Sequence, residues 1–408
     1  MTAKAPCSSA HPDRPLTVGL VVGEESGDFL GGALMASLKA KLGTGLRFCG
    51  SGGHRMQAEG LTSVFDIADT SVMGLTAVLQ RLPLIIKRVH QTVDALVEAD
   101  PDVIVIIDSP DFTHNVAKRV RRKAPHIPIV GYVSPSVWVW RPGRARKMRA
   151  YVDALLALLP FEPAVHARLG GPATHYVGHP LIEHLGDLRP APGERSDRDD
   201  PHRVLVVLPG SRGSEIERLL PVFGETVARV AARVPDLEVL LPAVPHLVSR
   251  IRQETASWPV KPTILEGEAA KNEAFRRAHA ALAASGTVTL QLAIAGVPMA
   301  VAYKVDWFFR RLKDLNRIIP IAQVTSMVLP NIILGRNVIP EYLDEQVTPE
   351  ALAARLETLL TDTEERRSQV DAFGDLDAIM RLPESQSQSE AAARVVIDVL
   401  IRAGAVQA

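Results

Sequence analysis

Short apolar runs alternate with helical stretches along the first half of the chain. Runs rich in β-branched residues lie at 16–22, 103–107 and 127–133, and a helical pattern covers about 29–42. Apolar strands joined by helices are typical of a parallel sheet that is buried on both faces. The pattern therefore predicts a doubly wound α/β domain over residues 1–188.

The same pattern restarts in the second half. Apolar strands are predicted at 204–208, 237–241 and 278–284, and the first and last of them lead into helices. This repetition predicts two tandem doubly wound, Rossmann-like α/β domains with mainly parallel sheets. The second domain is expected over residues 204–385.

Two further segments complete the predicted organisation. Residues 189–203, RPAPGERSDRDDPHR, are dense in proline and charge and have no apolar periodicity. They are predicted to be an interdomain linker. The last segment, 386–408, has a helical pattern, and a return of this helix to the first domain is left open by the sequence.

The composition is that of an ordinary soluble globular protein of 408 residues, with 47% hydrophobic and 23% charged residues. Lysine plus arginine and aspartate plus glutamate both number 46, so the formal net charge is zero and nucleic acid is not an expected partner. Cys7 and Cys49 are the only cysteines, too few for a disulfide framework or a cysteine-based zinc cluster. Such a chain fits a reducing compartment.

The apolar segments predict a cytoplasmic protein. The first 15 residues lack the apolar core of a secretory signal. The longest apolar stretch, 292–303, contains Gly296 and Pro298 and is shorter than the ~20 residues that span a bilayer. Attachment to a membrane surface remains open.

Ligands of open parallel sheets bind beyond the carboxyl ends of the strands, so candidate chemistry is sought directly after each strand. The first strand is followed by GEESGD, whose two glycines permit tight turning but do not have the spacing of a dinucleotide fingerprint. Gly23, Glu24, Ser26, Gly27 and Asp28 are candidates for substrate contact. A plain turn with Ser26 or Asp28 as N-cap explains the same residues.

Two later loops suit phosphate groups. In LPGSRGSE, Gly210, Ser211 and Arg212 combine backbone donors, a hydroxyl and a guanidinium before a helix, a good site for a diphosphate. The alternative is that Arg212 only pairs with Glu215 or Glu217.

In ASGT, Ser285, Gly286 and Thr287 again lie between a strand and a helix, with Gln291 one turn further on the same face. Ordinary helix capping by Ser285 or Thr287 is the alternative.

One strand ends abruptly at a carboxylate. The apolar run VIVII is followed by Asp108, where an open α/β sheet keeps its catalytic groups, so Asp108 is a candidate general base. Helix capping is the competing explanation, and Asp111 fits that role. Two residues separate these carboxylates, so they do not form a metal-binding Asp-X-Asp. No metal and no cofactor are predicted.

Two segments suggest contact with apolar and anionic groups. VMGLTAVLQRLPLIIK, residues 72–87, is more apolar than a helix covering one core face needs, so a lipid-facing patch is predicted, with a fully buried helix as the alternative. The residues expected to face acyl chains or membrane are Met73, Leu75, Val78, Leu79 and Leu82. RPGRARKMR, residues 141–149, has five basic residues and follows SPSVWVW, which suits phosphate or bilayer-interface contact. Its alternative is a solvated face.

Seven motifs, read together, point to one family. GEESGD, DSPDF, YVSPSVWVWR, YVGHP, LPGSRGSE, ASGTVTLQ and LPNIILGR occur in this order between residues 23 and 336. The chain closely resembles the lipid-A-disaccharide synthases outside its first 15 residues and the predicted linker. The resemblance implies a two-domain GT-B glycosyltransferase, peripheral to the inner membrane. It implies transfer from UDP-2,3-diacylglucosamine to 2,3-diacylglucosamine 1-phosphate, an inverting reaction that releases UDP and leaves a β-1,6-linked disaccharide phosphate.

The resemblance also implies roles for individual residues. Asp108 corresponds to an essential aspartate that is a candidate general base, and Arg212 to an arginine that is important at the UDP end of the donor. The residues expected around the nucleotide are Ser285, Gly286, Thr287, Asn331, Gly335 and Arg336, and those expected near the substrate in the other domain include Ser134 and Trp138.

The chain departs from the family at two positions. Gln291 stands where a glutamate is usual, and Ser109 where alanine is common. Gln291 is therefore predicted to be a ribose contact and not a catalyst. His179 of YVGHP is a hinge or core residue as readily as a ligand.

Three rival functions remain at this point. They are another UDP-sugar GT-B enzyme such as a hexosamine 2-epimerase, a dinucleotide oxidoreductase, and a catalytically silent nucleotide-sugar-binding homologue. The glycine spacing disfavours the second, and Gln291 keeps the third open. Acyl-chain length and oligomeric state are not specified by the sequence.

Overall fold

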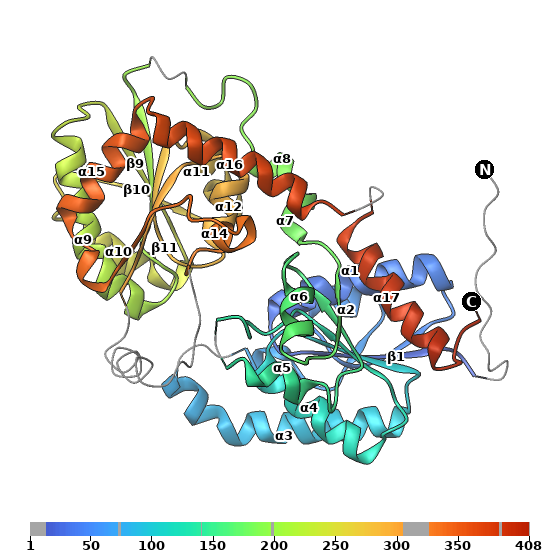
Figure 1. Ribbon diagram of the computed structural model, residues 1–408. Coiled ribbons are helices and arrows are strands. Elements are labelled where there is room, and N and C mark those ends of the chain that lie inside the picture. The colour runs from blue at the N-terminus through green and yellow to red at the C-terminus, as the bar shows by residue number, and fades with distance from the viewer. Residues whose placement is uncertain are drawn as a thin grey trace. The chain divides into compact units, whose positions relative to one another are not determined.

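The protein is described by a computed structural model that covers residues 14–71, 75–139, 141–196, 200–304, 326–382 and 386–407, with the backbone alone for 75–80. It divides into two compact units (Figure 1). Unit 1 comprises Met1–Pro180 and Leu382–Ala408, and unit 2 comprises Leu181–Arg381. Each unit is built on a parallel sheet with helices on its faces, which confirms the predicted fold class.

Unit 1 contains a seven-stranded sheet of order β3-β2-β1-β4-β5-β6-β7, in which all neighbours are parallel. The strands are β1 (Thr17–Val22), β2 (Arg47–Ser51), β3 (Thr62–Ser63), β4 (Val103–Ile107), β5 (Ile129–Tyr132), β6 (Ala154–Ala157) and β7 (Ala173–Tyr176). β4 is buried along its whole length because helices cover the centre of the sheet on both faces.

The helices of unit 1 form two layers. They are α1 (Glu25–Leu42), α2 (His54–Ala58), α3 (Leu75–Ala99), α4 (Pro110–Lys123), α5 (Gly143–Met148), α6 (Glu162–Arg168) and α17 (Gln388–Arg402), with the 3-10 turn η1 (Ile67–Asp69). α7 (Pro180–Glu183) begins at the last residue of the first segment of unit 1 and continues into unit 2. α1 and α17 pack in one core cluster and α3, α4 and α5 in another, on opposite faces of the sheet (Figure 1). None of the described helices is long and apolar enough to cross a bilayer.

The C-terminal helix α17 lies in unit 1, far from its neighbours in sequence. It packs along α1, where Ser37 and Ser389 are joined by a 2.9 Å hydrogen bond between their hydroxyl oxygens. The side-chain amide of Gln388 donates to the hydroxyl of Tyr132 at the end of β5. Val396 and Leu400 are fully buried and complete the core on the α1 face of the sheet.

Unit 2 contains a six-stranded parallel sheet of order β10-β9-β8-β11-β12-β13. The strands are β8 (Arg203–Leu208), β9 (Leu237–Ala243), β10 (Thr263–Glu266), β11 (Ala280–Ala284), β12 (Met299–Tyr303) and β13 (Glu341–Leu343). The helices are α8 (Leu185–Leu188), α9 (Gly213–Ala231), η2 (Pro245–Leu247), α10 (Val248–Thr255), α11 (Glu268–Arg277), α12 (Val288–Ile294), α14 (Leu329–Leu334), η3 (Asp344–Gln346), α15 (Pro349–Leu360) and α16 (Glu364–Met380).

The predicted linker, 189–203, belongs to unit 2, so the division between the units falls at Pro180 and not within this segment. The Arg195 guanidinium donates to four backbone carbonyl groups on two other segments, those of Phe275, Arg276, Ala295 and Gly296. The Arg189 guanidinium donates to the Ile294 carbonyl and pairs with Asp377. The charge density of this segment predicts a linker, but its arginines donate to carbonyl groups at the ends of α11 and α12 and so hold the segment against unit 2.

Candidate active site

In unit 1, Asp108 lies directly beyond the carboxyl end of β4 and is half-buried. The Ser26 hydroxyl donates to Asp108 Oδ2 at 2.8 Å, so the structure brings together two of the predicted site residues from loops 82 residues apart. Asp108 Oδ1 has no hydrogen bond to any residue that the structure describes. One carboxylate oxygen is thus held in place while the other is left for a proton.

The backbone around Asp108 is strained. Asp108, Ser109 and Val133 have φ angles of 53°, 40° and 75° in the left-handed region, where a β-branched valine is a clear outlier. The Asp108 N–H donates to the Tyr132 carbonyl at 2.9 Å, and the Thr113 hydroxyl donates to the Asp108 carbonyl at 2.6 Å. These bonds fix the turn, so the carboxylate has a defined direction before any ligand binds.

The other residues of the GEESGD loop have structural contacts. The Asp28 carboxylate is buried and accepts the backbone N–H groups of Gly53, Arg55 and Met56, so it caps α2 and is not exposed to a ligand. A Cβ atom on Gly27 would lie 3.2 Å from the Ile107 carbonyl oxygen, and one on Gly23 would lie 3.0 Å from the Ser109 Cβ. The loop needs these glycines because α1 approaches β4 closely. Glu24 is the half-exposed N-cap residue of α1.

Ser134 and Trp138 point inward from the segment after β5. The Ser134 hydroxyl lies 2.8 Å from His166 Nε2, and Trp138 Nε1 donates to Glu162 Oε1 at 3.3 Å. Glu162 and His166 lie on α6 and were not expected from the sequence. Their burial depends on the segment that folds over them, and no motif spacing signals it.

His179 stays neutral at pH 7, because burial lowers its pKa to about 4. His114 on α4 behaves similarly: burial first, then the positive charges of Arg144 and Lys118, lowers its pKa to about 4. His114 Nδ1 lies 3.0 Å from the Tyr151 hydroxyl. Both histidines are therefore uncharged near neutral pH, and protonating them in acid is unfavourable for the folded state of unit 1.

The low pKa of His114 makes stability depend on pH in a defined direction. The folded protein leaves His114 unprotonated between its ordinary pKa of 6.5 and about 4, whereas the unfolded chain binds a proton there. Stability is therefore present above pH 6.5 and lost as the pH falls, by up to about 1.4 kcal/mol per pH unit. We expect urea denaturation between pH 6.5 and 4.5 to show a shallower loss for His114→Gln than for the wild type. His126→Gln is the control, because the His126 side chain is exposed. Equal slopes of unfolding free energy against pH for the wild type and His114→Gln would contradict the assignment.

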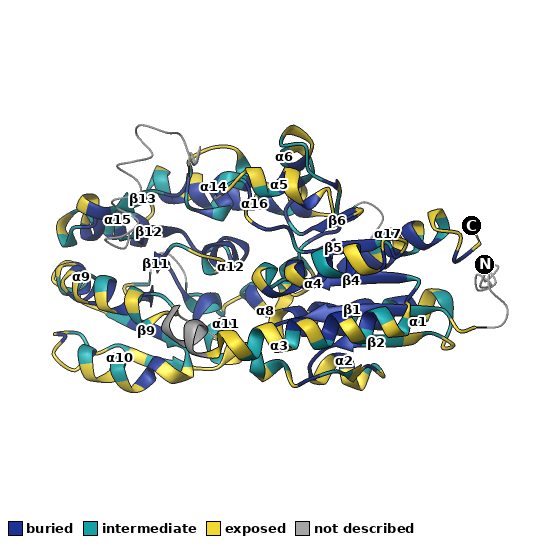
Figure 2. Ribbon diagram, turned by 90° about the horizontal axis from the view of Figure 1, so that it is seen from below, coloured by how far each residue is buried: buried dark blue, intermediate teal, exposed yellow. Residues whose placement is uncertain are grey.

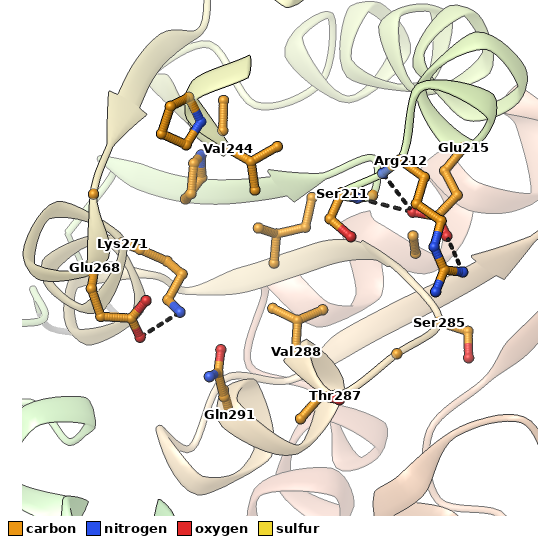
Figure 3. Close-up of a pocket in the computed structure, with 18 residues that line it drawn as sticks. Ser211, Arg212, Glu215, Val244, Glu268, Lys271, Ser285, Thr287, Val288 and Gln291 are labelled. Carbon is orange, nitrogen blue, oxygen red and sulfur yellow. Dashed lines mark hydrogen bonds and ion pairs between the residues drawn. The ribbon is translucent and has the colours of Figure 1, made fainter. Parts of the chain in front are cut away.

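Unit 2 holds a cavity of about 550 Å³ beyond the carboxyl ends of β8, β9 and β11 (Figure 3). Its lining joins the two predicted phosphate loops, the turn after β9 and the start of α11. The predicted residues that line it are Gly210, Ser211, Arg212, Ser285, Gly286, Thr287 and Gln291. This is where an open parallel sheet binds its ligands.

The LPGSRGSE loop is held by its own glutamate. Glu215 Oε2 accepts the backbone N–H groups of Ser211 and Arg212 at 2.9 and 3.2 Å, so these two donors are already engaged. Gly210 has a φ of 119°, and a Cβ atom there would lie 2.4 Å from Glu215 Oε2. The Arg212 side chain is 75% exposed and only 3.4 Å from Glu215 Oε1, so its guanidinium is the part of the loop best placed to meet an anion.

The ASGT loop offers backbone donors. The N–H groups of Gly286 and Thr287 have no acceptor among the described residues, whereas the Ser285 hydroxyl is engaged with the Met327 carbonyl at 2.6 Å. Gln291 on α12 directs its amide toward the cavity (Figure 3). Two unpaired N–H groups, a guanidinium and a neutral amide therefore belong to residues that line one cavity.

Sequence reasoning missed two charged residues of this cavity. Lys271 Nζ and Glu268 Oε1 form a 2.6 Å ion pair at the side of the cavity opposite Arg212 (Figure 3). They begin α11, directly after β10, so the rule of looking beyond each strand would have found them had β10 been recognised.

Asn331, Gly335 and Arg336 are not among the residues that line the cavity. Asn331 is buried and its side chain binds the backbone of 338–339, as well as Glu341 Oε1 at 2.9 Å. Gly335 ends α14 with a φ of 66°, and Arg336 forms an exposed ion pair with Asp375. Both polar atoms of the Asn331 amide are therefore hydrogen-bonded within the described part of the chain, and Asn331 and Gly335 fix the turn that follows α14.

The basic run after Trp140 separates into two parts. Arg144 Nη2 lies 3.0 Å from Asp111 Oδ1, three residues beyond Asp108. Arg146 and Arg149 lie toward the other end of α5, where they line an open surface cavity of about 620 Å³ with Arg168. The run therefore contacts both the neighbourhood of Asp108 and the residues that lead into β7.

On the predicted apolar patch, Leu82 and Ile86 of α3 are 42% and 47% exposed, and the outer face of this helix is largely exposed (Figure 2). Met73 lies outside the described residues, as do the side chains of Leu75, Val78 and Leu79. The part of α3 whose side chains are described, 81–99, thus carries large apolar side chains in solvent beside basic ones such as Arg81 and Lys87.

Taken by themselves, the units provide two kinds of chemistry. Unit 1 supplies an oriented carboxylate that can accept a proton, and unit 2 supplies a cavity lined by hydrogen-bond donors that can receive an anion. Within the described ranges, no three histidine, cysteine, aspartate or glutamate side chains are grouped to hold a metal ion. A carboxylate base and an anion-binding cavity are the components that a transfer from a nucleotide sugar requires.

Known relatives cover most of the chain. The chain is 51% identical over 397 residues to the lipid-A-disaccharide synthase of Nitrobacter winogradskyi, covering 96% of this chain and 97% of that protein. It is 54% identical over 361 residues to the lipid-A-disaccharide synthase of Bradyrhizobium diazoefficiens, covering 88% and 91%.

Solved structures share the fold at low sequence identity. The UDP-GlcNAc 2-epimerase from Neisseria meningitidis superposes with a TM-score of 0.56 at 11% identity, covering 95% of this chain and all of that one. The glycotransferase of kitacinnamycin superposes with a TM-score of 0.58 at 17% identity and the same coverage. The fold is thus the GT-B fold, which epimerases and glycosyltransferases share.

The family model for lipid-A-disaccharide synthetase matches residues 18–395, nearly the whole chain. This match and the relatives above favour the main prediction over an epimerase or a silent homologue. The chain belongs to the lipid-A-disaccharide synthetase family.

Proposed function

We propose that this protein joins UDP-2,3-diacylglucosamine to 2,3-diacylglucosamine 1-phosphate, giving a tetraacyl disaccharide 1-phosphate and UDP. The proposal rests on the family match over residues 18–395. The observation that supports its chemistry is the Asp108 carboxylate, which is held by Ser26 through one oxygen while the other has no described partner.

The reaction assigns a task to each unit. The 6-hydroxyl oxygen of the acceptor bonds to the anomeric carbon of the donor as the bond from that carbon to the diphosphate oxygen breaks. The hydroxyl proton passes to Asp108, and the negative charge of the leaving group is met by Arg212 and the N–H groups of Gly286 and Thr287. Attack from the face opposite the leaving group inverts the anomeric carbon.

Two further contacts follow from the geometry. Gln291, with an amide directed toward the cavity, is suited to the ribose hydroxyls, which donate and accept as an amide does. Arg144, near Asp111 and close in sequence to the β5 loop, is suited to the acceptor phosphate.

A mass-spectrometric assay tests the activity. Purified protein is incubated with detergent-dispersed donor and acceptor, with and without a chelator. We expect a tetraacyl disaccharide phosphate in both samples, because the proposed chemistry uses no metal. UDP binding without product would favour another UDP-sugar reaction, and the Gln291→Glu variant would then be assayed first.

We also propose that the enzyme works at the cytoplasmic surface of the inner membrane, because both substrates carry acyl chains. The exposed Leu82 and Ile86 on α3 would enter the lipid interface, and the basic residues of α3, α4 and α5 would meet anionic headgroups. α4 and α5 with the segment between them, 110–149, carry ten lysines and arginines and one carboxylate, Asp111.

This proposal predicts the behaviour of a double variant. Leu82→Ser with Ile86→Ser should weaken binding to vesicles containing anionic phospholipid by about 30-fold, since each apolar side chain contributes roughly 1 kcal/mol when its exposed part is buried. Vesicle co-sedimentation measures the effect, and higher salt should weaken binding further. Ile379→Ser in unit 2, where Ile379 is 39% exposed, is the matched control and should bind as the wild type does. Equal binding of the double variant and the control would refute the role of α3.

A further inference from the structure

Glu162, the first residue of α6, is a buried carboxyl that no motif of the family singled out. Glu162 is only 3% exposed. Oε1 accepts Trp138 Nε1–H at 3.3 Å, and Oε2 accepts the Leu159 N–H at 3.0 Å. Burial raises the pKa of Glu162 to about 7, and hydrogen bonds from Leu159, Trp138 and Ser134 oppose that rise. Both carboxyl oxygens are therefore used as acceptors for N–H donors.

The segment that Glu162 holds, 134–139, makes its other inward contacts at the same place. The Trp138 ring meets the Phe161 ring edge-on, with centroids 5.2 Å apart. The Ser134 hydroxyl lies 2.8 Å from His166 Nε2, one turn along α6. Anchors at both ends of the segment thus converge on one short helix, and Glu162 is the only acceptor that the described residues offer to the Trp138 indole.

This segment begins beside Asp108. The Asp108 N–H donates to the Tyr132 carbonyl, and Val133, the next residue, has the strained φ of 75°. β4 and β5 are neighbours in the sheet, with Ile107 paired to Tyr132. The chain therefore leaves β5 next to the proposed base, in a direction that a β-branched residue does not adopt freely, and a contact further along must hold it there.

The cluster under the segment is not optimised for stability. A buried carboxyl costs free energy unless its hydrogen bonds compensate it. His166 Nδ1 is also buried without a hydrogen-bond partner in the described part of the chain. Unfavourable groups of this kind persist at sites where they fix a functional geometry.

We propose that Glu162 is a positioning residue for the acceptor: it locks segment 134–139 as the wall beside Asp108 against which the acceptor sugar lies. The inference rests on the proposed function and adds a determinant of acceptor affinity within it. A glutamine at this position has one acceptor oxygen for two N–H donors, so either the Trp138 indole of the segment or the Leu159 N–H before α6 loses its partner, although the side-chain shape is kept.

The test compares Glu162→Gln and Trp138→Phe, singly and together, with the wild type. Trp138→Phe removes the indole N–H and keeps an aromatic ring against Phe161. We expect the KM for the acceptor to rise about tenfold in each single variant and no further in the double variant. The two effects do not add because both substitutions act on the same Trp138–Glu162 hydrogen bond. The KM for the donor and the affinity for UDP should stay within twofold of wild type, since the UDP cavity lies in unit 2. Glu59→Gln, which removes a partly buried carboxylate paired with Lys39 in unit 1, is the matched control.

Hydrogen–deuterium exchange provides a second readout that needs no turnover. Amides of 134–139 should exchange at least tenfold faster in Glu162→Gln, with the amides of β4 and of unit 2 unchanged. An unaltered acceptor KM together with unaltered exchange would overturn the proposal, as would an equal loss of UDP affinity, which would indicate general damage. A wild-type protein that neither binds nor uses the acceptor would overturn the proposed function and this inference with it, whereas a defect confined to the variants supports the inference.

Discussion

Replacing Asp108 with asparagine is expected to lower the turnover number by ~10² to 10⁴ while leaving substrate affinity largely intact. An amide cannot take the acceptor proton, but its oxygen can still accept the Ser26 hydroxyl. The strained backbone makes this the right substitution. Asp108 has a φ of 53°, and asparagine tolerates the left-handed region better than alanine does, so Asp108→Ala would mix a folding defect with the chemical one.

Single-turnover and steady-state kinetics on the same product assay separate a loss in the chemical step from a loss of substrate affinity. Asp398→Asn, an exposed carboxylate on α17, is the matched control and should turn over at the wild-type rate. Donor and acceptor affinities measured on Asp108→Asn should stay within a few-fold of wild type. Turnover within threefold of wild type would remove Asp108 from the proton transfer.

Truncating Arg212 to alanine is expected to weaken UDP binding by ~1.5 to 3 kcal/mol, a loss of roughly 10- to 150-fold. The guanidinium is mostly exposed and makes one loose contact, with Glu215 at 3.4 Å, so its removal leaves the loop intact. The loop geometry depends on Glu215 and on the backbone of Ser211, which the substitution does not touch. Loss of affinity can therefore be read as loss of the charged contact to phosphate.

Isothermal titration with UDP measures this effect directly. Arg229→Ala, further along α9 and paired with Glu350, is the control for loss of a positive charge. The difference between wild type and Arg212→Ala should shrink as salt is raised, because the lost contact is ionic and exposed. If UDP binds Arg212→Ala as tightly as wild type, the diphosphate lies elsewhere in the cavity.

The fold could be predicted from the sequence wherever a strand is a long apolar run. β4 coincides with the predicted 103–107, because five consecutive buried residues leave a continuous apolar signal. β6, ALLA, and β7, ATHY, were not identified. β6 is a run of only four apolar residues, which periodicity cannot tell from a buried helix, and the four residues of β7 are of mixed character. β10, with an exposed residue at each end, escaped for the same reason.

The candidate site could be predicted only where it depends on position after a strand. Asp108 and the two loops that line the unit 2 cavity were identified in this way. Lys271 was missed because β10, the strand before its helix, was not recognised. Glu162 could not be predicted, because its carboxylate meets Trp138 only when the segment after β5 folds against α6. Asp28 shows the converse. It has the residue type and the place of a ligand contact, yet tertiary structure uses it to cap a helix 26 residues further along the chain.

The return of α17 to unit 1 has a consequence for the order in which the protein is made. The ribosome releases the seven strands of the N-terminal sheet first, but the helix that covers one of its faces beside α1 is encoded after all of unit 2. Until α17 emerges, the surface that receives Val396 and Leu400 is open to solvent or to a chaperone. A premature stop before α17 would therefore leave the core of unit 1 incomplete, although unit 1 is synthesised first. A chain that lacks α17 is thus expected to be less stable in its N-terminal sheet than the full chain.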